Sequence, residues 1–75
     1  MNYTDRIIAD PKIMLGKPII KGTRITVEII LRKMSEGADK NALLEMYPQL
    51  IEEDLNAVIN YASDVIGNEK IIDPN

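Results

Sequence analysis

Residues 16–26 read GKPIIKGTRIT, and the rest of the chain is best interpreted outward from this stretch. Pro18 fixes its own φ at about −65° and disfavours a helical conformation at the residue before it. Gly22 adopts a positive φ at little steric cost. The stretch therefore predicts a short strand at residues 19–20, followed by a tight turn at residues 21–23 and an extended exit from the turn.

A first amphipathic helix is expected directly after the stretch. Thr26 is a good N-cap for a helix over residues 27–36, and Gly37 is well placed to end it. Apolar side chains then recur at the spacing of one helical face. The residues of this face are Val27, Ile30, Leu31 and Met34.

Two further helices follow. Asp39 is the expected N-cap of a helix over residues 40–47, and Pro48 stops that helix. The third helix is expected over residues 52–66, closed by Gly67. Its apolar stripe consists of Leu55, Val58, Ile59, Ala62 and Ile66.

The N-terminal segment contains short extended candidates. Residues 7–9 are apolar and precede a predicted turn at Asp10-Pro11. The apolar run at residues 12–15 fits either a strand or a single helical turn. Paired with residues 19–20, it would form at most a small hairpin, which must pack on helices or pair across a dimer.

These elements predict a mainly α fold, with a short N-terminal β-hairpin followed by a three-helix, helix-turn-helix-like (homeodomain-like) bundle. We expect one domain over residues 1–75. It would comprise a basic hairpin arm (1–25), a trihelical core (26–67) and a C-terminal tail (68–75), in which Ile71-Ile72 would dock on a partner strand or fray.

The composition limits the possible chemistry. The chain has 75 residues and neither cysteine nor histidine. This excludes disulfides and thiolate metal sites, and it removes the commonest zinc ligand and the usual general base. The glycine-rich stretch lacks the spacing of a nucleotide-binding loop. The sequence therefore predicts no enzyme activity, no catalytic residues, no metal and no cofactor.

The small size also predicts self-association. A core of this size supplies roughly 3–5 kcal/mol, and no disulfide or metal is available to reinforce it, so a dimer is expected. The sequence shows no apolar run near the length of a membrane span and no signal-peptide pattern. It therefore predicts a cytoplasmic protein without a membrane partner.

Charge is distributed unevenly along the chain. The net charge is −3, yet residues 1–33 contain seven basic and three acidic side chains, and residues 34–75 contain two basic and nine acidic ones. This asymmetry indicates one surface for an anionic partner and another for a basic one, unless the charges merely solvate the surface.

The stretch and a later segment also carry a family resemblance. Residues 16–25, then Tyr47-Pro48-Gln49-Leu50, Asp54 and Tyr61-Ala62, resemble the domain-of-unknown-function family 433. The resemblance implies a trihelical, helix-turn-helix-like core and a bacterial antitoxin role beside a PIN-like nuclease toxin. The family usually has Thr or Ser where Ile51 stands, so a side-chain N-cap is expected to be missing. The acidic residues 52–54 would compensate through the helix dipole.

Contact with a partner is expected from Lys17, Lys21 and Arg24. The third helix has no basic residue within residues 52–66, and only Asn56 and Asn60 would read bases. Three functions remain open: an antitoxin-like module that neutralises a PIN-like nuclease, a DNA-binding regulator using the same basic segment, and a non-catalytic assembly domain. The expected structural residues of the motif are Gly16, Pro18, Gly22, Thr23 and Pro48.

Overall fold

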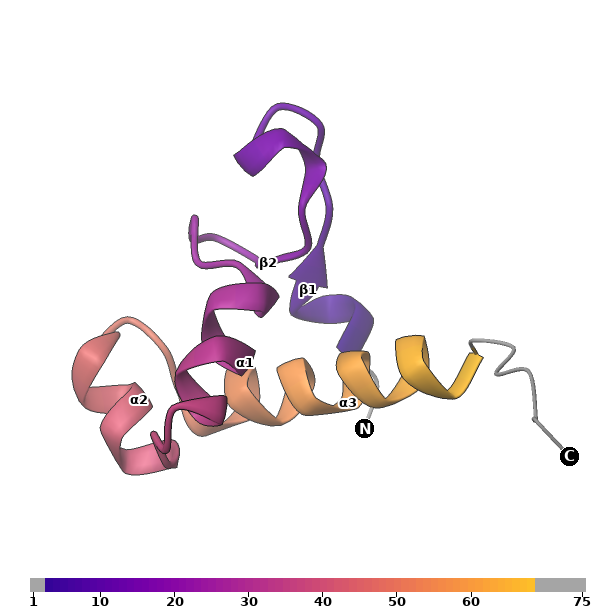
Figure 1. Cartoon of the computed structure of the whole chain (residues 1–75). Coiled ribbons are helices and arrows are strands. Elements are labelled where there is room, and N and C mark those ends of the chain that lie inside the picture. The colour runs from indigo at the N-terminus through magenta and orange to yellow at the C-terminus, as the bar shows by residue number, and fades with distance from the viewer. Residues whose placement is uncertain (1–2, 69–75) are drawn as a thin grey trace, which may run out of the picture.

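The computed structural model describes residues 3–68. In chain order, the elements are the 3-10 turn η1 (Tyr3–Asp5), β1 (Ile7–Ile8), the 3-10 turn η2 (Met14–Gly16), β2 (Ile19–Ile20), α1 (Val27–Ser35), α2 (Lys40–Met46) and α3 (Glu52–Asn68). The long helix α3 runs beneath α1 and the hairpin in Figure 1, and α2 lies toward its N-terminal end. The fold is mainly helical with a small N-terminal hairpin, as predicted.

The hairpin pairs β1 with β2. The strands are antiparallel, with Ile7 opposite Ile20 and Ile8 opposite Ile19. The predicted strand at residues 19–20 is confirmed, but its partner is β1 and not the run at residues 12–15. Pairing with β1 places Ile7 and Ile20 in the same buried cluster as side chains of all three helices, which offsets the weakness of a two-residue ladder.

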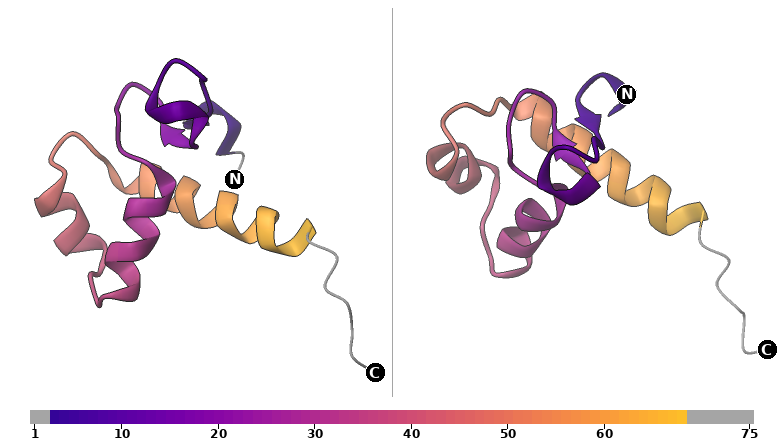
Figure 2. Two further views of the ribbon diagram at one scale, coloured as in Figure 1. Left: turned by 45° about the horizontal axis from the view of Figure 1, so that its top comes forward. Right: turned by 90° about the horizontal axis from the view of Figure 1, so that it is seen from above.

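Residues 9–18 form the loop between the strands and project from the rest of the fold (Figures 1 and 2). The Asp10 carbonyl accepts a hydrogen bond from the Ile13 N–H at 2.9 Å, and the Asp10 carboxylate accepts one from the Lys12 N–H at 2.9 Å. The turn at η2 follows immediately. Because these backbone bonds are local, residues 12–15 do not form a strand.

The predicted tight turn after β2 is confirmed. Gly22 has φ +82°, and a side-chain Cβ at this position would meet no described heavy atom within 4 Å, so conformation and not space favours glycine there. The Thr23 hydroxyl donates to the Ile20 carbonyl at 2.7 Å and accepts from the Ile25 N–H at 3.0 Å. Thr23 therefore closes the turn with its side chain.

The caps of α1 lie where the sequence places them. The Thr26 hydroxyl accepts a hydrogen bond from the Ile29 N–H at 3.1 Å. Gly37, at φ +105°, donates its N–H to the Met34 carbonyl at 3.0 Å. The helix ends at Ser35, one residue before the predicted end.

The second helix also follows its local signals. The Asp39 carboxylate accepts from the Ala42 N–H at 2.9 Å. The helix ends at Met46, and Tyr47 leaves the helical conformation (φ −128°, ψ 77°) before Pro48. This is the conformational restriction that a proline imposes on the residue before it.

The start of α3 contains an interaction that the sequence analysis missed. One oxygen of the Asp54 carboxylate accepts from the Ile51 N–H at 3.0 Å, and the other accepts from the Arg6 guanidinium at 3.0 Å. Asp54 is only 8% exposed. Ile51 supplies no side-chain cap, as expected. The prediction that acidic residues there act through the helix dipole was incomplete, because Asp54 also satisfies an unpaired N–H and ties α3 to the start of β1.

The end of α3 corrects a prediction. The helix continues through Gly67 to Asn68 instead of closing at Gly67. Gly67 does not take the positive φ seen at the glycines of the turns and of the α1 end, so it does not act as a left-handed cap. The predicted role of Ile71-Ile72 concerns residues outside those that the structure describes.

The buried face of α3 differs from the predicted stripe. Leu55 and Val58 are buried as expected, but Ile59 is 41% and Ile66 60% exposed, whereas Ala57 is fully buried. The hairpin and α1 cover the N-terminal part of α3, and its C-terminal end extends beyond them (Figures 1 and 2). The core cluster consists of Ile7, Ile20, Val27, Ile30, Leu43, Leu50, Leu55, Ala57 and Val58.

Candidate partner-binding surface

Lys21 and Arg24 are both exposed on the tight turn between β2 and α1. Neither side chain forms an ion pair or a side-chain hydrogen bond with another residue in the range 3–68. Among the cations of that range, only Lys12 shares this property. The turn is held by Thr23, so it presents both charges on a fixed backbone. These two predicted contact residues are therefore available to a partner.

Lys17 has a different environment. Its ammonium group lies 2.9 Å from a carboxylate oxygen of Glu28, and the Arg32 guanidinium lies 3.5 Å from the other oxygen. The hydrogen bond from Lys17 lowers the pKa of the Glu28 carboxyl. The pairing therefore stabilises the fold at pH values above the ordinary pKa of the Glu28 carboxyl. This contribution is lost as the pH falls through the lowered pKa. Lys17 is paired within the chain, in contrast to Lys21 and Arg24.

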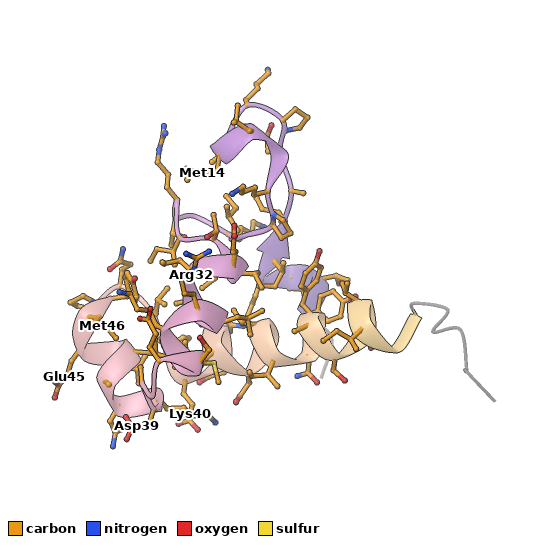
Figure 3. The ribbon with its side chains drawn as sticks, viewed as in Figure 1. Met14, Arg32, Asp39, Lys40, Glu45 and Met46 are labelled. Atoms are coloured by element: carbon orange, nitrogen blue, oxygen red, sulfur yellow. The ribbon has the colours of Figure 1, made fainter. Side chains whose placement is uncertain are left out.

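A shallow hollow of about 250 Å³ lies between η2 and α1. Met14 on η2 and Arg32 on α1 both line it, and Figure 3 labels these two residues. Its lining residues are Met14, Lys17, Thr26, Glu28, Ile29 and Arg32. The hollow thus combines apolar walls with one carboxylate and two cations.

The loop above this hollow displays a leucine. Leu15 is 94% exposed and has φ +58°, between Met14 at +51° and Gly16 at +81°. A left-handed conformation costs an L-residue about 1–2 kcal/mol. Sequence reasoning missed this residue because an apolar run resembles a buried element. The available signal was the Asp10-Pro11 turn before it and the glycine after it.

The two asparagines of α3 that were expected to contact bases already form hydrogen bonds within the fold. The Lys40 ammonium donates to the Asn56 side-chain oxygen at 2.8 Å and lies 3.4 Å from the Glu52 carboxylate. The Asn60 amide donates to the Asn56 carbonyl at 3.0 Å. A base edge would have to compete with these contacts.

The structure also bears on metal binding and membrane insertion. In residues 3–68, no group of three or more acidic side chains is arranged to hold a metal ion. Within the same range, none of the helices has the length and apolar character needed to cross a bilayer.

These features define a small three-helix domain with an N-terminal β-hairpin whose connecting segments carry exposed basic side chains. The family model described as "Protein of unknown function (DUF433)" matches residues 7–62, and the chain belongs to this family. The predicted family membership is confirmed.

Two proteins are similar to this chain, and the first of them is a solved member of the same family. The crystal structure of a DUF433 member from Anabaena variabilis superposes with a TM-score of 0.80 at 31% identity; the match covers 85% of this chain and 63% of that one. This chain therefore spans less than two thirds of that relative. An "Uncharacterized protein" of Archaeoglobus fulgidus is 54% identical over 28 residues, which are 37% of this chain and 78% of the relative.

Proposed function

We propose that this chain is a non-catalytic, antitoxin-like binding module that neutralises a PIN-like nuclease in the cytoplasm. The observation that carries the proposal is the pair of cations, Lys21 and Arg24, held without partners among the described residues on a closed turn. Unpaired, exposed cations on a fixed backbone favour an acidic partner surface by steering association and by pairing at the interface. A nuclease site that binds catalytic metal ions through carboxylates provides such a surface.

The electrostatics favour the turn over α3 as the contact. Every described charge on α3 is acidic, and Asn56 already accepts a hydrogen bond from Lys40. A recognition helix in DNA normally presents basic and amide side chains to phosphates and bases. A DNA-binding regulator that uses the same turn is the second candidate, because Lys21 and Arg24 would suit phosphates equally well. The assembly domain remains the third.

The test is a comparison of two double variants. We expect Lys21→Glu with Arg24→Glu to weaken binding to the PIN-like nuclease that we propose as the partner at least about tenfold, because both charges would then oppose an acidic surface. Asn56→Ala with Asn60→Ala should leave the affinity within about threefold, because neither residue lies on the turn. Isothermal titration calorimetry measures both, and circular dichroism checks that each variant is folded.

The same variants distinguish the alternatives. If the wild-type chain binds duplex DNA and not the nuclease, each lost phosphate contact should reduce the salt slope of log K by about 0.9, and the regulator is correct. A dominant effect of the asparagine pair would identify α3 as a recognition helix and contradict the charge argument. Binding to neither ligand would leave the assembly domain.

We also expect the purified chain to self-associate. The core is small, and Ile59, Val65 and Ile66 leave 41%, 43% and 60% of their surface exposed on α3. Burying this surface between copies would stabilise the fold. Light scattering at micromolar concentration should return a mass above the 8.4 kDa of one chain; a mass equal to one chain would contradict the prediction.

A further inference from the structure

We propose that Leu15 is an apolar anchor for a protein partner with an acidic surface. Its side chain docks the loop of residues 9–18 into an apolar hollow of that partner, beside the acidic groups that contact Lys21 and Arg24. This inference rests on the proposed function, because it assigns a further contact with the same partner. It adds an apolar, geometrically specific element to a surface otherwise defined by charge.

The display of Leu15 is the first support. Its side chain is 94% exposed, and Met14 beside it is 41% exposed. The backbone around it is held by hydrogen bonds from the Gly16 N–H to the Ile13 carbonyl and from the Lys17 N–H to the Met14 carbonyl, each 3.1 Å long. A leucine held in a left-handed conformation with almost no contact inside the described chain is unfavourable for folding alone. Such outliers occur at binding sites, where a partner supplies the missing contact.

The charge around the loop defines the kind of partner. Lys12 lies in the same loop, three residues before Leu15, and within residues 3–68 it is unpaired like Lys21 and Arg24. The loop's own carboxylate, Asp10, accepts the Lys12 backbone N–H. Glu28, beside the loop, is paired with Lys17. The three unpaired cations, Lys12, Lys21 and Arg24, therefore outnumber Asp10, whose carboxylate forms no ion pair within residues 3–68, and an acidic surface is complementary to this excess positive charge.

The placement of the two segments makes one surface feasible. The loop between β1 and β2 and the turn between β2 and α1 both lie on the side of the fold away from α3 (Figures 1 and 2). A partner that covers this side contacts the leucine and the cations together. A phosphate backbone offers no apolar hollow for Leu15, and one leucine buries too little apolar surface to anchor the chain on a membrane. A protein surface offers both carboxylates for the cations and an apolar hollow for Leu15, and it is the partner that we assign.

The experiment measures the dissociation constant for the PIN-like nuclease with four forms of the full chain. Leu15→Asn should weaken binding at least about tenfold, because the variant loses the free energy of burying a leucine side chain in the interface. Leu15→Met, which keeps an apolar side chain, should stay within about threefold of the wild type. Met46→Asn is the matched control, since it makes the same kind of change at a 44% exposed apolar position on α2, outside the surface expected to self-associate, and should leave the affinity unchanged.

Folding is controlled separately. Asparagine tolerates the left-handed conformation better than leucine, and Leu15 makes few contacts, so Leu15→Asn should melt no earlier than the wild type by circular dichroism. A loss of affinity in this variant then reports a lost contact with the partner and not a lost fold.

The outcomes separate this inference from the proposed function. If Leu15→Asn binds the nuclease like the wild type while the Lys21→Glu, Arg24→Glu variant does not, the anchor is wrong and the proposed function stands. If the wild-type chain does not bind the nuclease, both are wrong. If Leu15→Asn loses binding to vesicles containing phosphatidylserine but keeps its affinity for the nuclease, Leu15 serves a membrane contact and the anchor is again wrong.

Discussion

Replacing Asp54 with alanine should lower the free energy of unfolding by about 3 kcal/mol. The carboxylate is nearly buried and accepts two hydrogen bonds, from the Ile51 N–H and from the Arg6 guanidinium. Its removal leaves both donors without their acceptor at the junction of α3 and β1. For a domain with only roughly 3–5 kcal/mol of stability, this would leave a substantial fraction of the molecules unfolded. Urea denaturation followed by circular dichroism, at one protein concentration, measures the change.

Three variants separate the parts of this effect. Asp54→Asn keeps an oxygen for the Ile51 N–H but loses the charge opposite Arg6, so its loss should be smaller. Arg6→Met removes the ion pair and leaves the cap. Glu53→Ala changes an exposed carboxylate in the same helical turn and should cost less than about 1 kcal/mol. If Asp54→Ala costs no more than Glu53→Ala, the buried contact does not hold α3 to the hairpin.

The local parts of the fold were predictable because their partners lie close in the sequence. Thr26 and Asp39 cap helices through N–H groups three residues ahead. Gly37 ends α1, and Pro48 follows the end of α2. Each of these signals depends on one backbone turn and on the residue type that fits it.

The contacts that were missed join distant segments. Arg6 and Asp54 are 48 residues apart, and no local rule pairs them. An acidic residue at the third position of a helix that lacks a side-chain cap was the only hint of the bond from Ile51. Similarly, the pairing of β1 with β2 depends on which apolar residues reach the core, and this is not determined by the composition of a short run.

The candidate surface was predictable in part. A glycine-containing turn with polar flanks is exposed in most folds, so the exposure of Lys21 and Arg24 followed from the turn itself. The pairing of Lys17 with Glu28 spans 11 residues and depends on how the loop meets α1. The exposure of Leu15 was not visible, because hydrophobicity predicts burial unless the backbone directs the side chain outward.

Replacing Thr23 with valine tests whether the turn is held as the structure indicates. Valine keeps the shape of threonine but removes the hydroxyl that bonds the Ile20 carbonyl at 2.7 Å and the Ile25 N–H at 3.0 Å. At about 1 kcal/mol for each net hydrogen bond, the free energy of unfolding should fall by about 2 kcal/mol. Thermal denaturation should show a midpoint lower by roughly 8–16 °C.

The matched control for this prediction is Thr23→Ser, which keeps the hydroxyl and should lose less than half as much stability. The Ile20 carbonyl also accepts from the Thr23 backbone N–H at 3.0 Å, which valine retains, so the Ile25 N–H is the group left with no acceptor in the variant.

Because the turn carries Lys21 and Arg24, the valine variant should also bind the acidic partner more weakly under conditions where it is folded. Equal melting midpoints for valine, serine and the wild type would mean that the backbone alone fixes the turn, and the fixed presentation of the two cations would then not depend on Thr23.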